Sequence, residues 1–199
     1  MLGFEHQSVS HLSGTATLLG ASIVESSFDV FFHLTAILLS FVLGASLSGF
    51  LLHGDALKLG RHYDTVLVIE SALIFLALYL LSIGSYYGHF VASAACGAQN
   101  ALATTYSGAV LRTTHLTGIF TDLGIMVGSA LRGGAFDKRK AILFFLIVFG
   151  FIFGGTFGAY LFSHFQFKAL LAPGSICLLL AGVYRVYLKK QLVYPGRAD

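Results

Sequence analysis

Long apolar runs separated by short polar stretches dominate the chain, and they predict about seven hydrophobic segments. Most of the runs are long enough to cross ~30 Å of hydrocarbon at about 1.5 Å per helical residue. These strong runs are residues 30–52, 65–86, 112–131, 140–163 and 168–188. Two weaker segments, 8–24 and 89–105, carry more polar residues, which is typical of helices shielded by stronger neighbours or lining a cavity. The pattern predicts an all-α, polytopic membrane helix bundle that forms a single integral membrane domain over residues 1–199.

A repeated motif divides these segments into two groups. His11-Leu-Ser-Gly14 and His115-Leu-Thr-Gly118 are nearly identical and lie 104 residues apart, by the difference 115 − 11. A second pair, Phe41-Val-Leu-Gly44-Ala45 and Phe151-Ile-Phe-Gly154-Gly155, lies 110 residues apart, by the difference 151 − 41. Repeated multi-helix units are common in transporter-type membrane proteins, with a site where the units meet. An even number of predicted spans separates the two motif copies, so they predict parallel, pseudo-symmetric repeats.

The two repeats are predicted to be unequal. Repeat two, residues 89–199, contains four segments, whereas repeat one, residues 1–88, contains counterparts for only the last three. Repeat one therefore lacks its first helix, either as a natural short form or through a start assigned too far downstream. Residues 1–24 have no basic leading region with a compact apolar core, so a cleaved signal peptide does not explain the difference.

Composition agrees with a membrane location. Apolar residues make up 56% of the chain and charged residues only 11%, against about 25% in soluble domains, and the mean hydropathy is +0.83. The net charge of +3 is small and sits in loops, which argues against a nucleic-acid partner. Cys96 and Cys177 both fall inside apolar segments, which favours buried thiols over a disulfide framework.

The distribution of Lys and Arg orients the predicted bundle. With seven spans, Lys58, Arg61, Arg112 and Lys168 lie on one side. The loop 132–140 and the C-terminal tail lie on the other side and hold Arg132, Lys138, Arg139, Lys140, Arg185, Lys189, Lys190 and Arg197. The positive-inside rule then places the C-terminus in the cytoplasm and the N-terminus outside, in the inner (cytoplasmic) membrane.

Two motif-bearing segments resemble a known family. Gly97-Ala-Gln99-Asn100-Ala101 is followed by Thr114-His115-Leu-Thr-Gly118-Ile-Phe-Thr121-Asp122-Leu-Gly124. In this order they resemble the signature of the YoaK-like family of uncharacterised bacterial multi-pass membrane proteins (domain of unknown function 1275). The chain departs from that family at the first helix, where a Gly-Tyr-x-Asp-Ala-like segment has no counterpart. The resemblance implies a membrane fold and location, and it transfers no settled activity.

The candidate chemistry is most concentrated in residues 112–131. Asp122 lies midway between two arginines that bracket the segment, so it is expected near the bilayer centre, where a carboxylate costs ~2.5–3.5 kcal/mol. His115, Gly118 and Asp122 share one helical face, and Thr121 lies on an adjacent stripe. A histidine and a carboxylate facing a cavity can bind a solute or relay protons. The alternative is that Asp122 bonds a polar side chain on the next helix and only fixes packing.

Other polar residues are weaker candidates. Gln99 and Asn100 can donate to a substrate or to Asp122, or they can make interhelical hydrogen bonds worth ~0.6 kcal/mol on average. Glu70 lies about one turn inside its segment and can snorkel or pair with Arg61. His11 matches His115 in the repeat, but its helix has Leu18 where the other has Asp122, so a shared site would be asymmetric.

Metal and cofactor sites are not expected. The chain has no His-x-x-x-His or Cys-x-x-Cys spacing. Only the pair His11 and His115, brought together by pseudo-symmetry, offers axial ligands, and this is a minor alternative. Ridges of small residues, Gly150-x-x-x-Gly154-x-x-x-Gly158 and Ala45-x-x-x-Gly49, predict tight helix packing instead.

Two classes of function remain open. The first is a small-solute or proton-coupled transporter with a midplane polar site, and its partners are the lipid bilayer and a small-molecule solute. The second is a non-transporting membrane subunit or scaffold that packs against a second copy or a partner subunit through glycine-rich helix faces. No hydrolase elbow or phosphate-binding loop is present, so an enzyme is not expected.

Overall fold

The predicted segments fold as α-helices, in the order and close to the positions that the hydrophobic pattern indicates. The computed structural model describes residues 2–3, 7–52, 62–107 and 115–193. Their helices are α1 (Leu12–Val24), α2 (Phe28–Leu51), α3 (Tyr63–Ser82), α4 (Tyr87–Tyr106), α5 (Leu116–Leu131), α6 (Lys138–Phe165), the short 3-10 helix η1 (Gln166–Leu170) and α7 (Leu171–Val193). Two short strands, β1 (Leu2–Gly3) and β2 (Gln7–Ser8), pair antiparallel before α1. The all-α class is confirmed.

Within the described part of the chain, three helical stretches are long and apolar enough to cross a membrane. They are Phe28–Leu51, Tyr63–Ser82 and the 52-residue stretch Lys138–Lys189, which contains α6, η1 and most of α7. At about 1.5 Å per residue the last stretch is ~78 Å long, enough for two crossings of ~30 Å of hydrocarbon. Gln166, with φ of 50°, turns the backbone between α6 and α7. The shorter apolar helices α1 and α5 have 13 and 16 residues.

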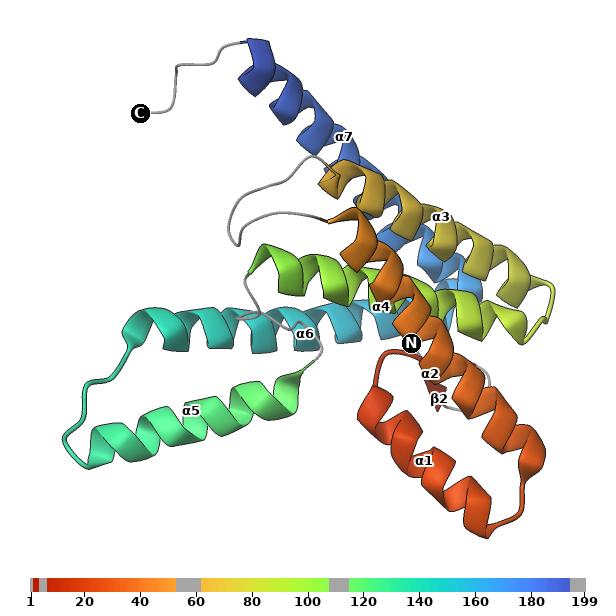
Figure 1. Ribbon diagram of the computed structural model, residues 1–199, viewed down its shortest axis with the longest axis horizontal. Helices are drawn as coiled ribbons and strands as arrows, with labels where there is room; N and C mark the ends of the chain where they lie inside the picture. The colour runs from red at the N-terminus through yellow and green to blue at the C-terminus, as the bar shows by residue number, and fades with distance from the viewer. Residues whose placement is uncertain (1, 4–6, 53–61, 108–114, 194–199) are drawn as a thin grey trace.

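The core lies where α2, α3, α4 and α7 pack together (Figure 1). Small residues let α2 and α4 approach closely: the Cα of Gly44 faces the Ala94 carbonyl, and Gly97 faces the Phe41 carbonyl, with no room for a Cβ at either glycine. The Ser48 hydroxyl donates to the Ala98 carbonyl oxygen across this interface at 2.9 Å. Such contacts are how helices associate in lipid, where apolar side chains alone give no preference for protein over hydrocarbon.

The α3–α7 contact repeats this principle. The Ser71 hydroxyl donates to the Gly174 carbonyl oxygen at 2.8 Å, and the Phe75 ring lies against Gly174. Around it, a cluster of buried side chains joins α3, α4, η1 and α7: Ile74, Leu81, Ala95, Leu170 and Cys177. The structure therefore places α3 at the centre of the packing, between α4 and α7.

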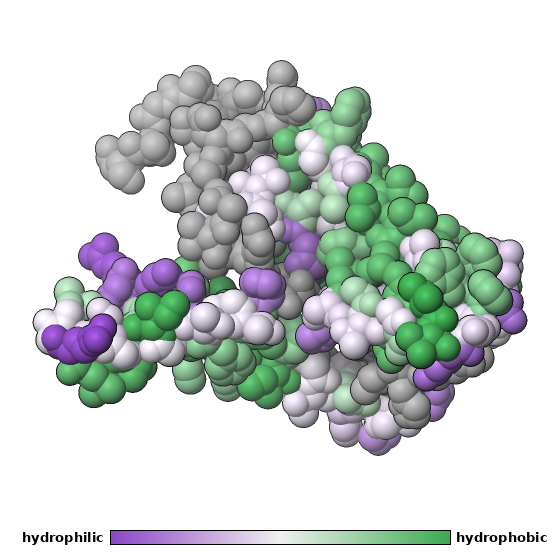
Figure 2. Space-filling view, turned by 60° about the horizontal axis from the view of Figure 1, so that its bottom comes forward, coloured by the Kyte–Doolittle hydropathy of each residue, from purple (hydrophilic) through white to green (hydrophobic). Residues whose placement is uncertain are grey.

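Three further helices lie outside this core: α1 packs on α2, and α5 packs on α6. In Figure 1 the α1–α2 hairpin extends to one side, and α5 with α6 forms an arm on the other side. Asp137 caps α6 by accepting a hydrogen bond from the Lys140 backbone N–H at 3.0 Å. Figure 2 shows hydrophobic residues reaching the surface over both the bundle and the arm. Exposed apolar side chains of this extent match a protein whose solvent is hydrocarbon.

The two motif copies have similar local geometry. α1 begins at Leu12 and α5 at Leu116, 104 residues apart (116 − 12), while α2 begins at Phe28 and α6 at Lys138, 110 residues apart (138 − 28). These two offsets equal those of the repeated motifs. The packing around the copies differs, however, because Gly44 is buried against α4 whereas its counterpart Gly154 faces open space. The predicted tight packing of the α6 glycine ridge is therefore not present within the described part of the chain.

Candidate functional site

His115 begins α5 and leans over the first turn of the helix. It is the N-cap residue, with φ of −95° and ψ of 53°, and its ring occupies the space that a side chain at Gly118 would need. Thr121 turns its hydroxyl inward and donates to the Thr117 carbonyl oxygen at 2.9 Å. His115 and Gly118 are therefore neighbours at the start of α5, and Thr121 makes its hydrogen bond within the helix one turn further on.

Asp122 pairs with a lysine of the neighbouring helix. Its Oδ2 lies 3.6 Å from the Lys140 Nζ, and the two side chains are 47% and 44% exposed. The Lys140 ammonium also lies 5.2 Å from the centre of the Phe144 ring. This ion pair joins α5 to α6. The sequence suggested two other roles for Asp122, which were binding a solute or proton in a cavity and a hydrogen bond to a polar side chain of the next helix.

The repeat partner His11 has the same local role as His115 in a different hairpin. It is the N-cap of α1, with φ of −98° and ψ of 71°. Thr17 donates to the Ser13 carbonyl oxygen at 3.0 Å, which matches the hydrogen bond of Thr121. Because α1 packs on α2 and α5 packs on α6, the two histidines belong to separate hairpins. Among the described residues no group of three or more His, Cys, Asp or Glu side chains is arranged to hold a metal ion.

Gln99 and Asn100 lie on α4, a different element from Asp122, and Gln99 is exposed while Asn100 is partly buried. Gln99 lines a cavity of about 140 Å³ between α3, α4 and the start of α7. The other lining residues are Ile74, Ala77, Ala92, Ala95, Cys96 and Pro173. The Asn100 side chain donates to the Cys96 carbonyl oxygen, one turn earlier on the same helix, at 3.0 Å. The structure thus brings Gln99 to a cavity, and Asp122 is not among the residues that line it.

Glu70 is the buried acidic residue beside this region. It lies in α3 with 4% of its surface exposed, and its Oε2 has no hydrogen-bond partner in the described part of the chain. The thiol of Cys177 donates a hydrogen bond to the Glu70 carboxylate, and Cys96 is close enough to interact with its charge. The pairing with Arg61 considered from sequence involves a residue outside the described ranges. The sequence indicated Glu70 because it is a carboxylate inside an apolar segment. The residues of α4 and α7 that surround Glu70 could not be predicted from the sequence.

Glu70 and the cavity belong to one neighbourhood. Ile74, which lines the cavity, follows Glu70 by one helical turn and therefore lies on the same face of α3. Cys96 lines the same cavity from α4 and interacts with Glu70. The cavity is lined by an amide and a thiol of α4, and the Glu70 carboxylate of α3 lies beside it without being one of the lining residues. This neighbourhood is the candidate site that the geometry favours.

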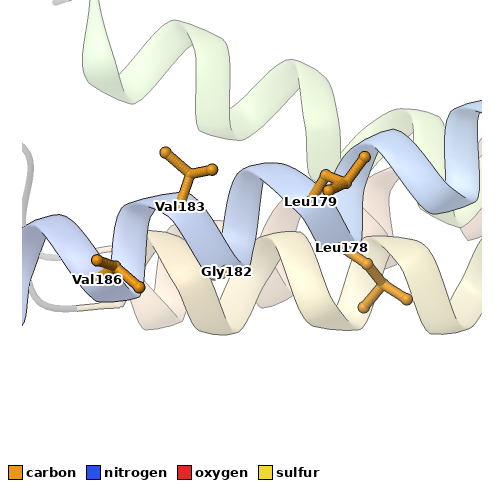
Figure 3. A pocket seen from close by; sticks show the side chains of 5 residues that line it. All are labelled: Leu178, Leu179, Gly182, Val183 and Val186. Atoms are coloured by element: carbon orange, nitrogen blue, oxygen red, sulfur yellow. The ribbon is translucent and has the colours of Figure 1, made fainter.

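A second, larger hollow has a different character. It is a shallow groove of about 580 Å³ on the surface of α7, lined by Leu178, Leu179, Gly182, Val183 and Val186 (Figure 3). All five lining residues come from one helix and none of them carries a polar side-chain atom. Such a surface offers an acyl chain or another helix a place to pack, but it gives a polar solute no partner.

The histidines His33 and His89 form a pair that the sequence did not single out. Their rings pack edge to face with centroids 5.5 Å apart, and His33 also lies against the Phe90 ring at 5.1 Å. His89 is buried, with 8% of its surface exposed. The two residues come from α2 and α4, which are in close contact, so no spacing within the chain could have indicated this pair.

Comparison with known proteins identifies the family of this chain. The family model described as a protein of unknown function, DUF1275, matches residues 1–183. No curated protein and no solved structure matches the chain significantly. The match covers well over half of the 199 residues, and the chain therefore belongs to the DUF1275 family.

Proposed function

We propose that this protein is a small-solute or proton-coupled membrane transporter whose working site is Glu70 and the adjoining α3–α4–α7 cavity. The observation that carries the proposal is the buried carboxylate, 4% exposed in an apolar helix, with one oxygen that has no hydrogen-bond partner among the described residues. A carboxylate inside a membrane segment is expensive, so it is a functional candidate by default. A solute or a proton supplies the partner that Oε2 lacks.

The volume of the cavity limits the size of the solute that can bind. A volume of about 140 Å³ holds a few waters, each of which takes up ~30 Å³ in the liquid. Gln99 offers both donor and acceptor atoms, while the rest of the lining is mostly apolar. In this proposal Glu70 binds the proton or a polar group of the solute, Gln99 orients it, and Cys177 holds the carboxylate in place.

In this proposal the residues of α5 are not part of the binding site. Lys140 neutralises Asp122, and both side chains are about half exposed, so the pair does not have the isolation of Glu70. His115 lies at the start of α5 on the same arm. We propose that His115, Gly118, Thr121 and Asp122 line the route by which protons reach the bundle, with Gln99 and Asn100 nearer the binding site and His11 as the counterpart on α1.

The proposal extends to family and orientation. We propose that the chain is a YoaK-like bacterial protein of the inner membrane, built from two parallel repeats, with its C-terminus in the cytoplasm. The equal offsets of the helix starts in the two hairpins support the repeats. The excess of Lys and Arg in residues 132–140 and the C-terminal tail supports the orientation.

The alternative function is a membrane scaffold or subunit without transport activity. It is favoured by one observation, the bare glycine face of α6, where Gly150, Gly154 and Gly158 have open space beside them. Such a face suits a partner helix more than a lipid tail. The two functions differ in whether water reaches the α3–α4–α7 cavity.

Water access to position 99 tests the transport proposal. In a variant without Cys96 and Cys177, single cysteines replace Gln99, Asp122 or Leu179, and a membrane-impermeant thiol reagent is applied from each side. We expect labelling of Gln99→Cys from at least one side, because a transport cavity must open to water. Leu179→Cys is the control. Leu179 is 68% exposed on the apolar surface of α7, where lipid and not water is expected, so this cysteine should not be labelled. Protection of position 99 from both sides in folded protein would contradict transport and support the scaffold.

A carbodiimide soluble in lipid tests Glu70 itself. Such a reagent modifies protonated carboxyl groups in apolar surroundings, and mass spectrometry locates the modified residue. We expect modification of Glu70 that declines as the pH is raised, and no modification at that position in Glu70→Gln. Asp122 serves as the internal comparison because its carboxylate is ion-paired with Lys140. Modification confined to other carboxylates would show that Glu70 does not exchange protons.

A further inference from the structure

Val9 is a buried residue that lies outside the helices of the bundle. It follows β2 and precedes His11, the N-cap of α1, and only 3% of its surface is exposed. It packs with Ala77 of α3 and Ala92 of α4 in one buried cluster, and Cys96 packs against the same cluster. The segment before α1 therefore reaches into the contact between α3 and α4.

This cluster adjoins the cavity of the candidate site. Ala77, Ala92 and Cys96 are all among the residues that line the cavity, whereas Val9 is not. Because Val9 contacts these residues without lining the cavity, it lies on the other side of this part of the wall. The two alanines contribute only one methyl group each, so the wall is thin here and Val9 fills the space behind it.

A shared hydrogen bond holds the backbone of Val9 to α4. The Ser93 hydroxyl lies 2.9 Å from the Ile37 carbonyl oxygen and 3.3 Å from that of Val9. A hydroxyl has one proton to donate, and the shorter distance, within the usual range of about 2.5–3.0 Å, favours Ile37 as the acceptor. When Val9 moves away, Ser93 therefore keeps its partner on α2, and no buried donor is left unsatisfied.

The contacts between the helices are harder to open. Separating α3 from α7 would take the Ser71 hydroxyl from its acceptor, the Gly174 carbonyl oxygen. Separating α2 from α4 would take the Ser48 hydroxyl from the Ala98 carbonyl oxygen in the same way. A donor left without an acceptor in apolar surroundings is costly. Opening the cavity at Val9 therefore costs less in hydrogen bonds than moving two helices apart.

We propose that Val9 is the gate of the α3–α4–α7 cavity. It closes the wall behind Ala77 and Ala92, and its withdrawal admits the solute or proton. α1 is the element that moves it, because α1 begins at Leu12, packs on α2 and has no residue in the described hydrophobic core clusters. This inference rests on the proposed transport function, since a gate has a role only where the cavity opens to water.

The labelling rate of a cysteine at position 99 tests the gate. Gln99→Cys is combined with Val9→Ala in the variant without Cys96 and Cys177, and a membrane-impermeant thiol reagent is applied from each side. We expect labelling several-fold faster than with Val9 present, because the smaller side chain leaves the space behind the wall unfilled. Val66→Ala is the matched control, the same substitution at a buried valine of a different cluster, and it should leave the rate unchanged.

The outcomes separate the gate from the function on which it rests. Equal rates with and without Val9→Ala, while position 99 is still labelled, would overturn the gate and leave transport standing. The same increase in Val66→Ala would also overturn it, because the effect would then be a general loss of packing. Protection of position 99 in every variant would contradict both the gate and transport.

A cysteine at position 9 tests whether the residue moves. Val9→Cys is compared with Val66→Cys in the same background, since the native residues are 3% and 1% exposed and both are protected in a static structure. We expect the reagent to label Val9→Cys in folded protein and to leave Val66→Cys unmodified. Protection of both positions would overturn the gate, whatever the result at position 99.

Discussion

Gly44 and Gly49 stand five residues apart on α2 and experience opposite surroundings. A Cβ on Gly44 would overlap the Ala94 carbonyl, whereas a Cβ on Gly49 would meet no atom within 4 Å. Composition counts both as glycine in a membrane span, and only the position of α4 separates them. The same distinction applies to the two acidic residues, since Glu70 is enclosed by three helices while Asp122 has a lysine partner and remains half exposed.

The two glycines lead to a paired stability prediction. Gly44→Ala is expected to destabilise the protein by about 1–3 kcal/mol, because α4 must move to admit the methyl group. Gly49→Ala is expected to be neutral or to stabilise by up to about 1 kcal/mol, through better helix propensity alone. Thermal unfolding in detergent micelles measures both. Similar midpoints for the two variants would show that α2 and α4 do not meet at Gly44.

At the scale of elements, the α5–α6 arm is held to itself more than to the bundle. The described side-chain link between its two helices is the ion pair of Asp122 with Lys140, and α5 also packs on α6. The bundle helices are joined instead by hydroxyl-to-carbonyl bonds and close backbone contacts. The helices themselves were predictable because apolar periodicity is local. How closely each pair of helices packs was not predictable, because it depends on residues that are distant in the sequence.

The contribution of the Asp122–Lys140 ion pair to the free energy of unfolding can be measured. A double-mutant cycle with Asp122→Asn and Lys140→Met is expected to give a coupling energy of about 0.2–1 kcal/mol, the range for ion pairs that remain partly exposed. Raising the salt concentration should reduce the coupling, since exposed charges are screened. Chemical unfolding of the purified protein in detergent measures it. A coupling near zero at low salt would show that α5 and α6 do not hold these two residues together.

At the scale of the whole molecule, the number of crossings decides the topology. α2, α3 and the stretch Lys138–Lys189 are long and apolar enough to span. α1 and α5, at 13 and 16 residues, measure about 20 and 24 Å, which is less than the ~30 Å of hydrocarbon. α4 has 20 residues but is also not among the helices apolar enough to span. Whether α1, α4 and α5 cross therefore determines on which side each terminus lies.

Reporter fusions test the topology. The proposed topology has seven crossings and a cytoplasmic C-terminus, so a C-terminal green fluorescent protein should fluoresce and a C-terminal alkaline phosphatase should be inactive. An N-terminal tag should be accessible to an impermeant label from outside the cell. Finding both termini on one side would mean that an even number of segments crosses, and α1 or α5 would be the first helix to reassign.

The sequence by itself determined the features that depend on neighbouring residues. It predicted the helices and their order, the apolar surfaces and the repeated motif, whose two copies both place a histidine at a helix start. These features follow from hydrophobic periodicity and from hydrogen bonds within a few residues. Only the tertiary structure decided which of the equivalent glycines is packed and which acidic residue is enclosed. Glu70 became the favoured candidate over Asp122 because its partners, Cys96 and Cys177, come from helices that are distant in the chain.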